Sequence, residues 1–159
     1  MNLFVNNRQV IKNLKLNTGT VAVPVWTALD TASEIAVNTE MEAQDFYVFV
    51  DALKRKVTTG ANIEFNTTVK IDMLNAAVLK IIDEINALVS TGDIAPFNTY
   101  QMQFDMLNGY NAETKVLKYQ TYQADNMAIE IAELGGAAEE VGDFELNLHL
   151  NGPATEVTE

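Results

Sequence analysis

Hydrophobic and polar positions alternate with a period of two along most of the chain. This alternation is typical of strands that have one buried and one exposed face. It is clearest over residues 144–150, where Phe144, Leu146, Leu148 and Leu150 are separated by single polar residues. The same pattern predicts further strands over residues 20–26, 34–40, 46–50, 63–71, 100–106, 114–124 and 127–131. The sequence therefore predicts a protein built mainly of β-strands.

One central segment, residues 72–91, breaks this alternation. Its apolar residues recur at steps of three and four, the period of an amphipathic helix. Asp72 can accept hydrogen bonds from the free N–H groups of a first turn, and Gly92 can adopt the left-handed conformation that ends a helix. We therefore expect one helix at about residues 72–91, with its apolar stripe packed on a sheet.

The order of these elements, strands then helix then strands, indicates an α+β fold. The expected architecture is an antiparallel β-sandwich or partly closed barrel with the helix on one flank. Residues 108–111, Asn-Gly-Tyr-Asn, tolerate positive φ and predict a hairpin turn between two of the strands. No repeat or linker is visible, so we expect residues 1–159 to form a single domain.

Composition and charge narrow the possible functions. Ten lysine and arginine residues stand against 22 aspartate and glutamate residues, giving a formal charge of −12. Such a surface disfavours sequence-specific nucleic-acid binding and attachment to anionic lipid, because both depend on cations that neutralise phosphate. The absence of cysteine excludes disulfides, thiolate nucleophiles and cysteine-ligated metal sites. We also expect neither a signal peptide nor a membrane-spanning segment.

The sequence offers few groups for catalysis. The single histidine, His149, falls on the polar side of a predicted strand, and the two serines, Ser33 and Ser90, lie outside any nucleophile motif. Adjacent carboxylates could act as acid and base or bind a divalent ion, but none has calcium-loop spacing. These pairs are Asp83 with Glu84, Glu139 with Glu140, and Asp143 with Glu145. We expect a protein that is not an enzyme and that has no metal or cofactor.

The acidic residues are unevenly distributed. From Tyr119 to Glu159 there are nine acidic residues and no lysine or arginine. Glu130 and Glu145 both occupy polar positions of alternating strands, so a shared sheet would give one face a broad negative surface. That surface is either a general solubilising coat or a wall past which a polyanion slides without binding.

A second unusual segment covers residues 39–59. An aromatic β-prone run containing Phe46 and Tyr47 is followed by a basic cluster, Lys54, Arg55 and Lys56. One interpretation is a plain strand with a solvated end. The alternative is a projecting hairpin whose residues contact an acidic surface of another subunit.

The order of these signals resembles the major tail tube protein of tailed bacteriophages, especially the siphophage type. The resemblance covers about residues 19–153. It comprises Trp26 followed by a polar loop, an acid-rich stretch at 40–45 with aromatics after it, and a basic stretch closed by residues 58–60. The helix then lies between two sets of strands, and residues 135–140 lead into the last strand.

This resemblance implies two packed sheets with a flanking helix, a long loop that contacts a neighbouring ring, and hexameric rings stacked into a tube. The tube would be a virion structure, made in the bacterial host cytoplasm, that conducts viral DNA without sequence-specific binding and without a membrane. Its implied partners are other copies of the chain, the tape-measure protein and the tail terminator or distal tail proteins. Residues 1–18 and 151–159 resemble an N-terminal arm and a short C-terminal tail.

The resemblance also assigns roles to residues. The contact loop would include Phe46, Tyr47, Lys54, Arg55 and Lys56. The acids expected to face the lumen are Glu130, Glu133, Glu139, Glu140 and Glu145. An inner-tube protein of a contractile tail, tailocin or secretion-type nanotube is the alternative, since such tubes share the same fold and wall chemistry.

Overall fold

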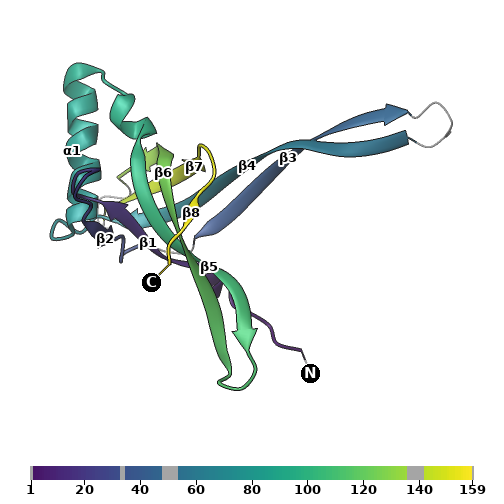
Figure 1. The fold of residues 1–159 in the computed structure, drawn as a ribbon. Coiled ribbons are helices and arrows are strands. Elements are labelled where there is room, and N and C mark those ends of the chain that lie inside the picture. Colours follow the sequence, from purple (N-terminus) through teal and green to yellow (C-terminus); the bar gives the residue numbers. More distant parts are fainter. Residues whose placement is uncertain (1, 33–34, 48–53, 136–141, 159) are drawn as a thin grey trace.

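A computed structural model describes residues 2–32, 35–47, 54–135 and 142–158 of the chain. Within these residues, eight strands form one antiparallel sheet accompanied by one α-helix (Figure 1). The elements are η1 (Asn7–Gln9), β1 (Ile11–Asn17), β2 (Trp26–Ala28), β3 (Ala36–Tyr47), β4 (Lys54–Lys70), α1 (Ala76–Thr91), η2 (Ala95–Asn98), β5 (Tyr100–Asn111), β6 (Val116–Leu134), β7 (Asp143–Leu150) and β8 (Thr155–Glu156). The predicted α+β, mainly β class is confirmed, and the sheet does not close into a barrel.

The long strand β6 joins two halves of the sheet. The strand order is β2-β1-β5-β6-β7-β4-β3, with β8 added at the edge of β6. β6 pairs with β5 over residues 116–127 and with β7 over residues 127–134. Phe65 of β4 and Phe104 of β5 are not on neighbouring strands, yet their ring centroids lie 4.9 Å apart. The two halves therefore face each other as a sandwich, with the buried apolar side chains between them.

The helix begins four residues later than predicted. Asn75, not Asp72, caps it: the Asn75 side-chain oxygen accepts hydrogen bonds from the N–H groups of Ala77 and Val78, at 2.9 and 3.3 Å. The Asn75 amide also donates to the carbonyl oxygen of Ala28 at 2.8 Å, which ties the helix start to β2. Asp72 instead accepts from the N–H of Leu74 and closes a turn before the helix.

The predicted end of the helix is confirmed. Gly92 follows the last turn with φ 72°, and its N–H donates to the carbonyl oxygen of Leu88 at 2.8 Å. A left-handed residue is favourable for glycine because it has no Cβ to clash with the backbone. The helix buries Ala77, Val78 and Ile81 against the sheet.

The N-terminal region differs from the prediction. Residues 11–17, assigned to an arm, form β1, and Ile11, Leu14 and Leu16 are buried in the core. The alternation is broken there because Asn13 has φ 55° within a bulge between Lys12 and Lys15. A shift of one residue changes which face the following side chains occupy, so the strand has no continuous period of two.

The predicted strand over residues 20–26 is wrong for most of its length. Residues 20–25 form a turn, and only Trp26 belongs to a strand. The Asn17 side-chain oxygen accepts hydrogen bonds from the N–H groups of Gly19 and Val25, both at 2.9 Å. Val21 and Val23 remain exposed, so their alternation does not mark a buried face.

The β5–β6 turn also lies further along the chain than predicted. Residues 108–111 belong to β5, and residues 112–115 form the turn. Asn111 accepts hydrogen bonds from the N–H groups of Glu113 and Thr114, and Lys115 has φ 57°. The pairing register of β5 with β6 shifts between Leu107 and Gly109. Gly109 is therefore part of a β-bulge and not of the turn.

Two further segments have defined positions. β3 and β4 pair along their whole described length and extend away from the body as a long hairpin (Figure 1). Of the two interpretations of residues 39–59, the described residues show the projection of a hairpin, while its contact with another subunit stays a prediction. Part of the expected C-terminal tail forms β8, which pairs with β6 through Thr155 and Glu156.

Candidate functional surface

One face of the sheet made by β3, β4, β7 and β6 carries polar side chains. Asn147 of β7 pairs with Asn66 of β4 on one side and with Glu130 of β6 on the other. These three residues therefore lie on the same face of the sheet. We call this the acidic face. Its described side chains are those of Asn38, Glu40, Asn62, Glu64, Asn66, Thr68, Lys70, Ala128, Glu130, Glu133, Asp143, Glu145, Asn147 and His149. The opposite face holds core residues such as Phe65 and Leu146.

The acidic face has little positive charge to balance its carboxylates. Among its described positions the basic side chain is that of Lys70, which binds Asp143 at 2.9 Å. Glu130, Glu133 and Glu145 are exposed and form no ion pair with any described residue. Glu133 and Glu145 are direct cross-strand partners, so two like charges stand opposite each other.

Removing one of these two charges is expected to stabilise the isolated subunit. Glu145→Gln should raise the free energy of unfolding by about 0.2–1 kcal/mol, because like charges at cross-strand distance repel. Salt screens exposed charges, so the gain should shrink in 1 M salt. Urea denaturation at low and high salt measures both effects. Glu113→Gln, in the β5–β6 turn, is the matched control, and no gain from Glu145→Gln would contradict the repulsion.

The structure brings together some of the predicted lumen-facing acids. Glu130 and Glu145 lie on the same face of adjacent strands, as their polar positions predicted, and the register shift between Ile131 and Glu133 brings Glu133 to that face as well. Glu139 and Glu140 lie outside the described residues. That these acids line a lumen stays a prediction.

The predicted contact residues lie on the β3–β4 hairpin. Phe46 and Tyr47 end β3, and Lys54 and Arg55 begin β4 directly opposite them in the register. Lys56 is exposed and lies across from Asp45. The basic cluster thus occupies the outer part of the hairpin, while the acidic face occupies its base and the neighbouring strands. Its role in subunit contacts stays a prediction.

The described residues do not assemble a recognisable catalytic or metal site. His149 is half-buried and lies across from Glu64 in the register. Ser90 donates a hydrogen bond to the carbonyl oxygen of Ala87 within α1. Across the described ranges, no cluster of three or more histidine, aspartate or glutamate side chains could bind a metal ion. None of the described helices has the length and hydrophobicity needed to cross a membrane.

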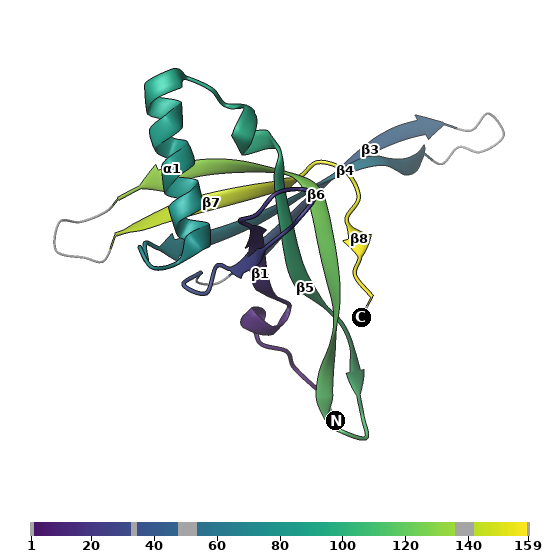
Figure 2. The same ribbon diagram turned by 60° about the vertical axis from the view of Figure 1, so that its left-hand side comes forward.

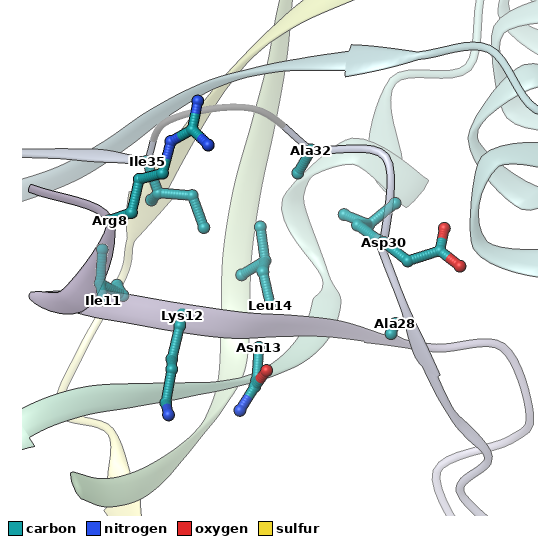
Figure 3. A pocket seen from close by; sticks show the side chains of 10 residues that line it. Arg8, Ile11, Lys12, Asn13, Leu14, Ala28, Asp30, Ala32 and Ile35 are labelled. Atoms are coloured by element: carbon teal, nitrogen blue, oxygen red, sulfur yellow. The ribbon is translucent and has the colours of Figure 1, made fainter. Parts of the chain in front are cut away.

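A cavity of about 450 Å³ lies between β1, β2 and the segment before β3 (Figure 3). Leu14 and Ile35 point into it, while Arg8 and Asp30 lie at opposite ends. Among the described residues, its remaining lining is mostly aliphatic and includes no serine or histidine. The cavity is on the body of the protein and not on the acidic face, and its described lining provides no nucleophile with an adjacent base.

Glu84, one of the adjacent carboxylates of the predicted helix, is partly buried in the structure. Its Oε2 atom is buried without a hydrogen-bond partner among the described residues. Burial raises the pKa of the Glu84 carboxyl; Lys80 lowers this pKa to a smaller extent and Asp83 raises it. Periodicity could not reveal this, because Glu84 is shielded by the chain around residues 17–21 and 96–101 that lies beside α1.

The raised pKa predicts how Glu84 affects stability. The folded state binds the proton more tightly than the unfolded state, so this contribution is fully present below the ordinary value of 4.5 and is lost as pH rises through the raised pKa. Glu84→Gln mimics the protonated form. We therefore expect the variant to melt higher than the wild type at pH 7, with the difference vanishing below pH 4.5.

Thermal unfolding across this pH range measures the effect of Glu84→Gln. Glu113→Gln is the matched control, since Glu113 is an exposed acid in the β5–β6 turn, away from Glu84. A variant that is less stable than the wild type at pH 7 would show that the charged form of Glu84 is favourable in the fold.

Comparison with known proteins identifies the fold. No protein-family model and no curated protein sequence matches the chain. Among solved structures, a chain in the tail of an empty gene transfer agent particle, obtained by helical refinement with C6 symmetry, has TM-score 0.59 and 9% identity, and 98% of this chain and 100% of that chain are covered. A chain in the virion of a native gene transfer agent gives TM-score 0.57, 9% identity, and coverage of 98% and 100%.

A third structure extends the likeness to another particle. A chain in the six-fold symmetrised baseplate of the anti-feeding prophage has TM-score 0.51 and 12% identity, with 99% of this chain and 97% of that chain covered. The sequences have diverged widely, so the likeness is one of fold. This protein therefore shares its fold, over nearly its whole length, with chains of phage-like tail and baseplate assemblies.

Proposed function

We propose that the protein is a structural subunit of a phage-type tail tube. Six copies form a ring, the rings stack into a tube, and the genome passes through the bore. The observation that carries the proposal is the fold correspondence over 98% of the chain with a tail chain refined in C6 symmetry. The role is structural and not catalytic, and the mature location is the virion tail after synthesis in the host cytoplasm.

The acidic face supports this proposal because its charge suits the wall of a DNA conduit. Duplex DNA carries dense phosphate charge, and proteins hold it mainly through lysine and arginine. A wall of carboxylates such as Glu130 and Glu145 repels phosphate along its length. DNA in such a bore slides without sequence-specific binding.

Two strand edges that have no neighbouring strand in the described part of the subunit support assembly into rings; η2 contacts the β6 edge near residues 128–130, so the open part of that edge is residues 131–134. Within the described residues, β3 pairs only with β4, and residues 128–134 of β6 pair only with β7. These edges bound the acidic face on its two sides. Open edges favour pairing with another chain, and a head-to-tail contact that closes gives a ring. Ring closure would continue the acidic face around a bore.

The tube belongs to a siphophage-type tail in this proposal, with the tape-measure protein and the tail terminator or distal tail proteins as further partners. A second candidate is the inner tube of a contractile tail, tailocin or secretion-type nanotube; the similarity to a chain in the anti-feeding prophage baseplate shows that the fold also occurs in a particle other than a gene transfer agent. A sheath gene beside the coding gene would favour the second candidate, and a tape-measure gene without a sheath gene the first.

Assembly of the purified protein tests the proposal. We expect sedimentation velocity and negative-stain microscopy to show rings or rods of uniform width, in equilibrium with subunits. The fraction assembled should rise with protein concentration, because assembly is a mass-action process. A protein that stays monomeric at high concentration, over a range of salt and pH, would refute it.

A further inference from the structure

A second hairpin extends from the body in a direction different from that of β3–β4 (Figures 1 and 2). β1 and the residue before it lie beside β5 only up to Leu107, whose N–H donates a hydrogen bond to the Val10 carbonyl oxygen. On the other side, the C-terminal segment last contacts β6 through Gln120 and Val157. Residues 108–119 therefore form a two-stranded ribbon with no further described strand beside it. Such a ribbon is marginally stable alone in water, so a partner that covers it would stabilise it.

The end of this ribbon carries exposed apolar side chains and two lysines against one acid, Glu113. Tyr110 and Val116 are 42% and 57% exposed. Lys115 and Lys118 are exposed and form no ion pair with any described residue. We call Tyr110, Lys115, Val116 and Lys118 the hairpin tip. Unpaired lysines are notable in a chain whose formal charge is −12.

A groove of complementary character lies beside α1. It has a volume of about 490 Å³ and is lined by Thr18, Ala76, Leu79, Lys80, Asp83 and Glu84. The Lys80 ammonium donates to the carbonyl oxygen of Asn17 at 2.9 Å and so is already engaged within the subunit. Asp83 is exposed, whereas the Oε2 atom of Glu84 is buried, so Asp83 is the carboxylate of this groove that is open to a second copy. We call this the α1 groove; it offers the Asp83 carboxylate and aliphatic surface.

The hairpin tip and α1 lie at opposite ends of the molecule in both views (Figures 1 and 2). A subunit therefore cannot place its own tip in its own groove. Two different surfaces at opposite ends form a heterologous contact, which generates a closed ring or an open series of copies. The charges and the exposed apolar side chains of the two surfaces match.

We infer that the hairpin tip of one copy binds in the α1 groove of a second copy, with its lysines beside Asp83 and with Tyr110 or Val116 over the aliphatic part of the groove. The inference rests on the proposed self-assembly and names a contact within it. The contact is separate from the acidic face and from the β3–β4 hairpin.

Charge reversal at the tip tests this contact. We expect Lys115→Glu with Lys118→Glu to raise the protein concentration needed for assembly by about tenfold or more, since like charges replace a complementary pair. Adding Asp83→Lys to the same chain should restore part of the loss. Glu113→Lys, which adds a cation to the same turn, is the matched control for the sign of the charge and should assemble at a concentration equal to or below that of the wild type.

Cross-linking tests the same contact without reversing charge. The chain has no cysteine, so introduced thiols report one pair of positions. A mixture of Lys115→Cys and Asp83→Cys copies should yield a disulfide-linked dimer on oxidation, because a disulfide requires Cα atoms within about 7 Å. Asp125→Cys in place of Asp83→Cys should yield none.

The outcomes separate the contact from the proposed function. If the wild type assembles and the charge-reversed tip assembles equally well, or if the two thiols do not cross-link within assemblies, the contact is overturned while the tube proposal stands. If the wild type itself forms no assemblies, the proposed function fails and this contact fails with it.

Discussion

Lysine in place of Glu130, Glu133 and Glu145 is expected to convert the proposed tube into one that retains DNA. Each substitution changes the local charge by two units, and the proposed ring would repeat the change in every subunit. Phosphate contacts by lysine give an affinity that falls by roughly 10³–10⁵ between 50 and 200 mM salt when 6–10 contacts form. The variant assemblies should therefore bind duplex DNA strongly at low salt and release it as salt rises.

Co-sedimentation of assemblies with duplex DNA at several salt concentrations measures this effect. The wild type should leave DNA in the supernatant under all conditions. A triple variant with glutamine at the same positions removes the negative charges without adding positive ones, and it should bind DNA only weakly. It therefore distinguishes the loss of repulsion from the gain of attraction. Lysine-bearing assemblies that bind no more DNA than the wild type would show that the acidic face does not meet the DNA.

Phe65→Ala is expected to have the largest effect on subunit stability. Phe65 is 1% exposed, and its ring packs against that of Phe104 on the other half of the sandwich. Truncating a buried phenylalanine loses apolar burial and leaves a cavity, which costs about 3–5 kcal/mol. That is a large share of the roughly 5–15 kcal/mol that holds a typical domain folded. Assembly should fail as well, because the acidic face and the core share the strand β4.

Urea denaturation of the isolated subunit measures the loss. Val21→Ala is the control, since Val21 is 79% exposed in a turn and its truncation should change stability by less than about 0.5 kcal/mol. A loss below about 1 kcal/mol for Phe65→Ala would mean that the two halves of the sandwich are not held together at this contact.

Period-two alternation predicted the strands that have a regular pleat. The strand predicted over residues 144–150 is observed as β7, which begins one residue earlier, at Asp143. The prediction succeeded because the apolar side chains of this strand alternate without interruption and all face the core. Alternation failed where the backbone departs from a regular pleat. The bulge at Asn13 hid β1, and a turn held by Asn17 gave residues 20–25 a false strand pattern.

The candidate surface was only partly predictable for the same reason. The alternation of apolar and polar residues predicted that Glu130 and Glu145 occupy the polar faces of their strands. It did not predict that β6 pairs with β7, which the structure shows. Strict alternation would put Glu133 on the opposite face from Glu130. The register shift between Ile131 and Glu133 returns Glu133 to the acidic face, opposite Glu145. The partial burial of Glu84 depends on segments distant in sequence and has no local signal.

A six-fold helical reconstruction of the assembled protein by cryo-electron microscopy tests the central claim most directly. We predict stacked hexameric rings whose bore is lined by β3, β4, β7 and β6, with Glu130 and Glu145 pointing inward. A tube with this face on its exterior, or a bore lined by the lysine-bearing ribbon of β5 and β6, would contradict the account.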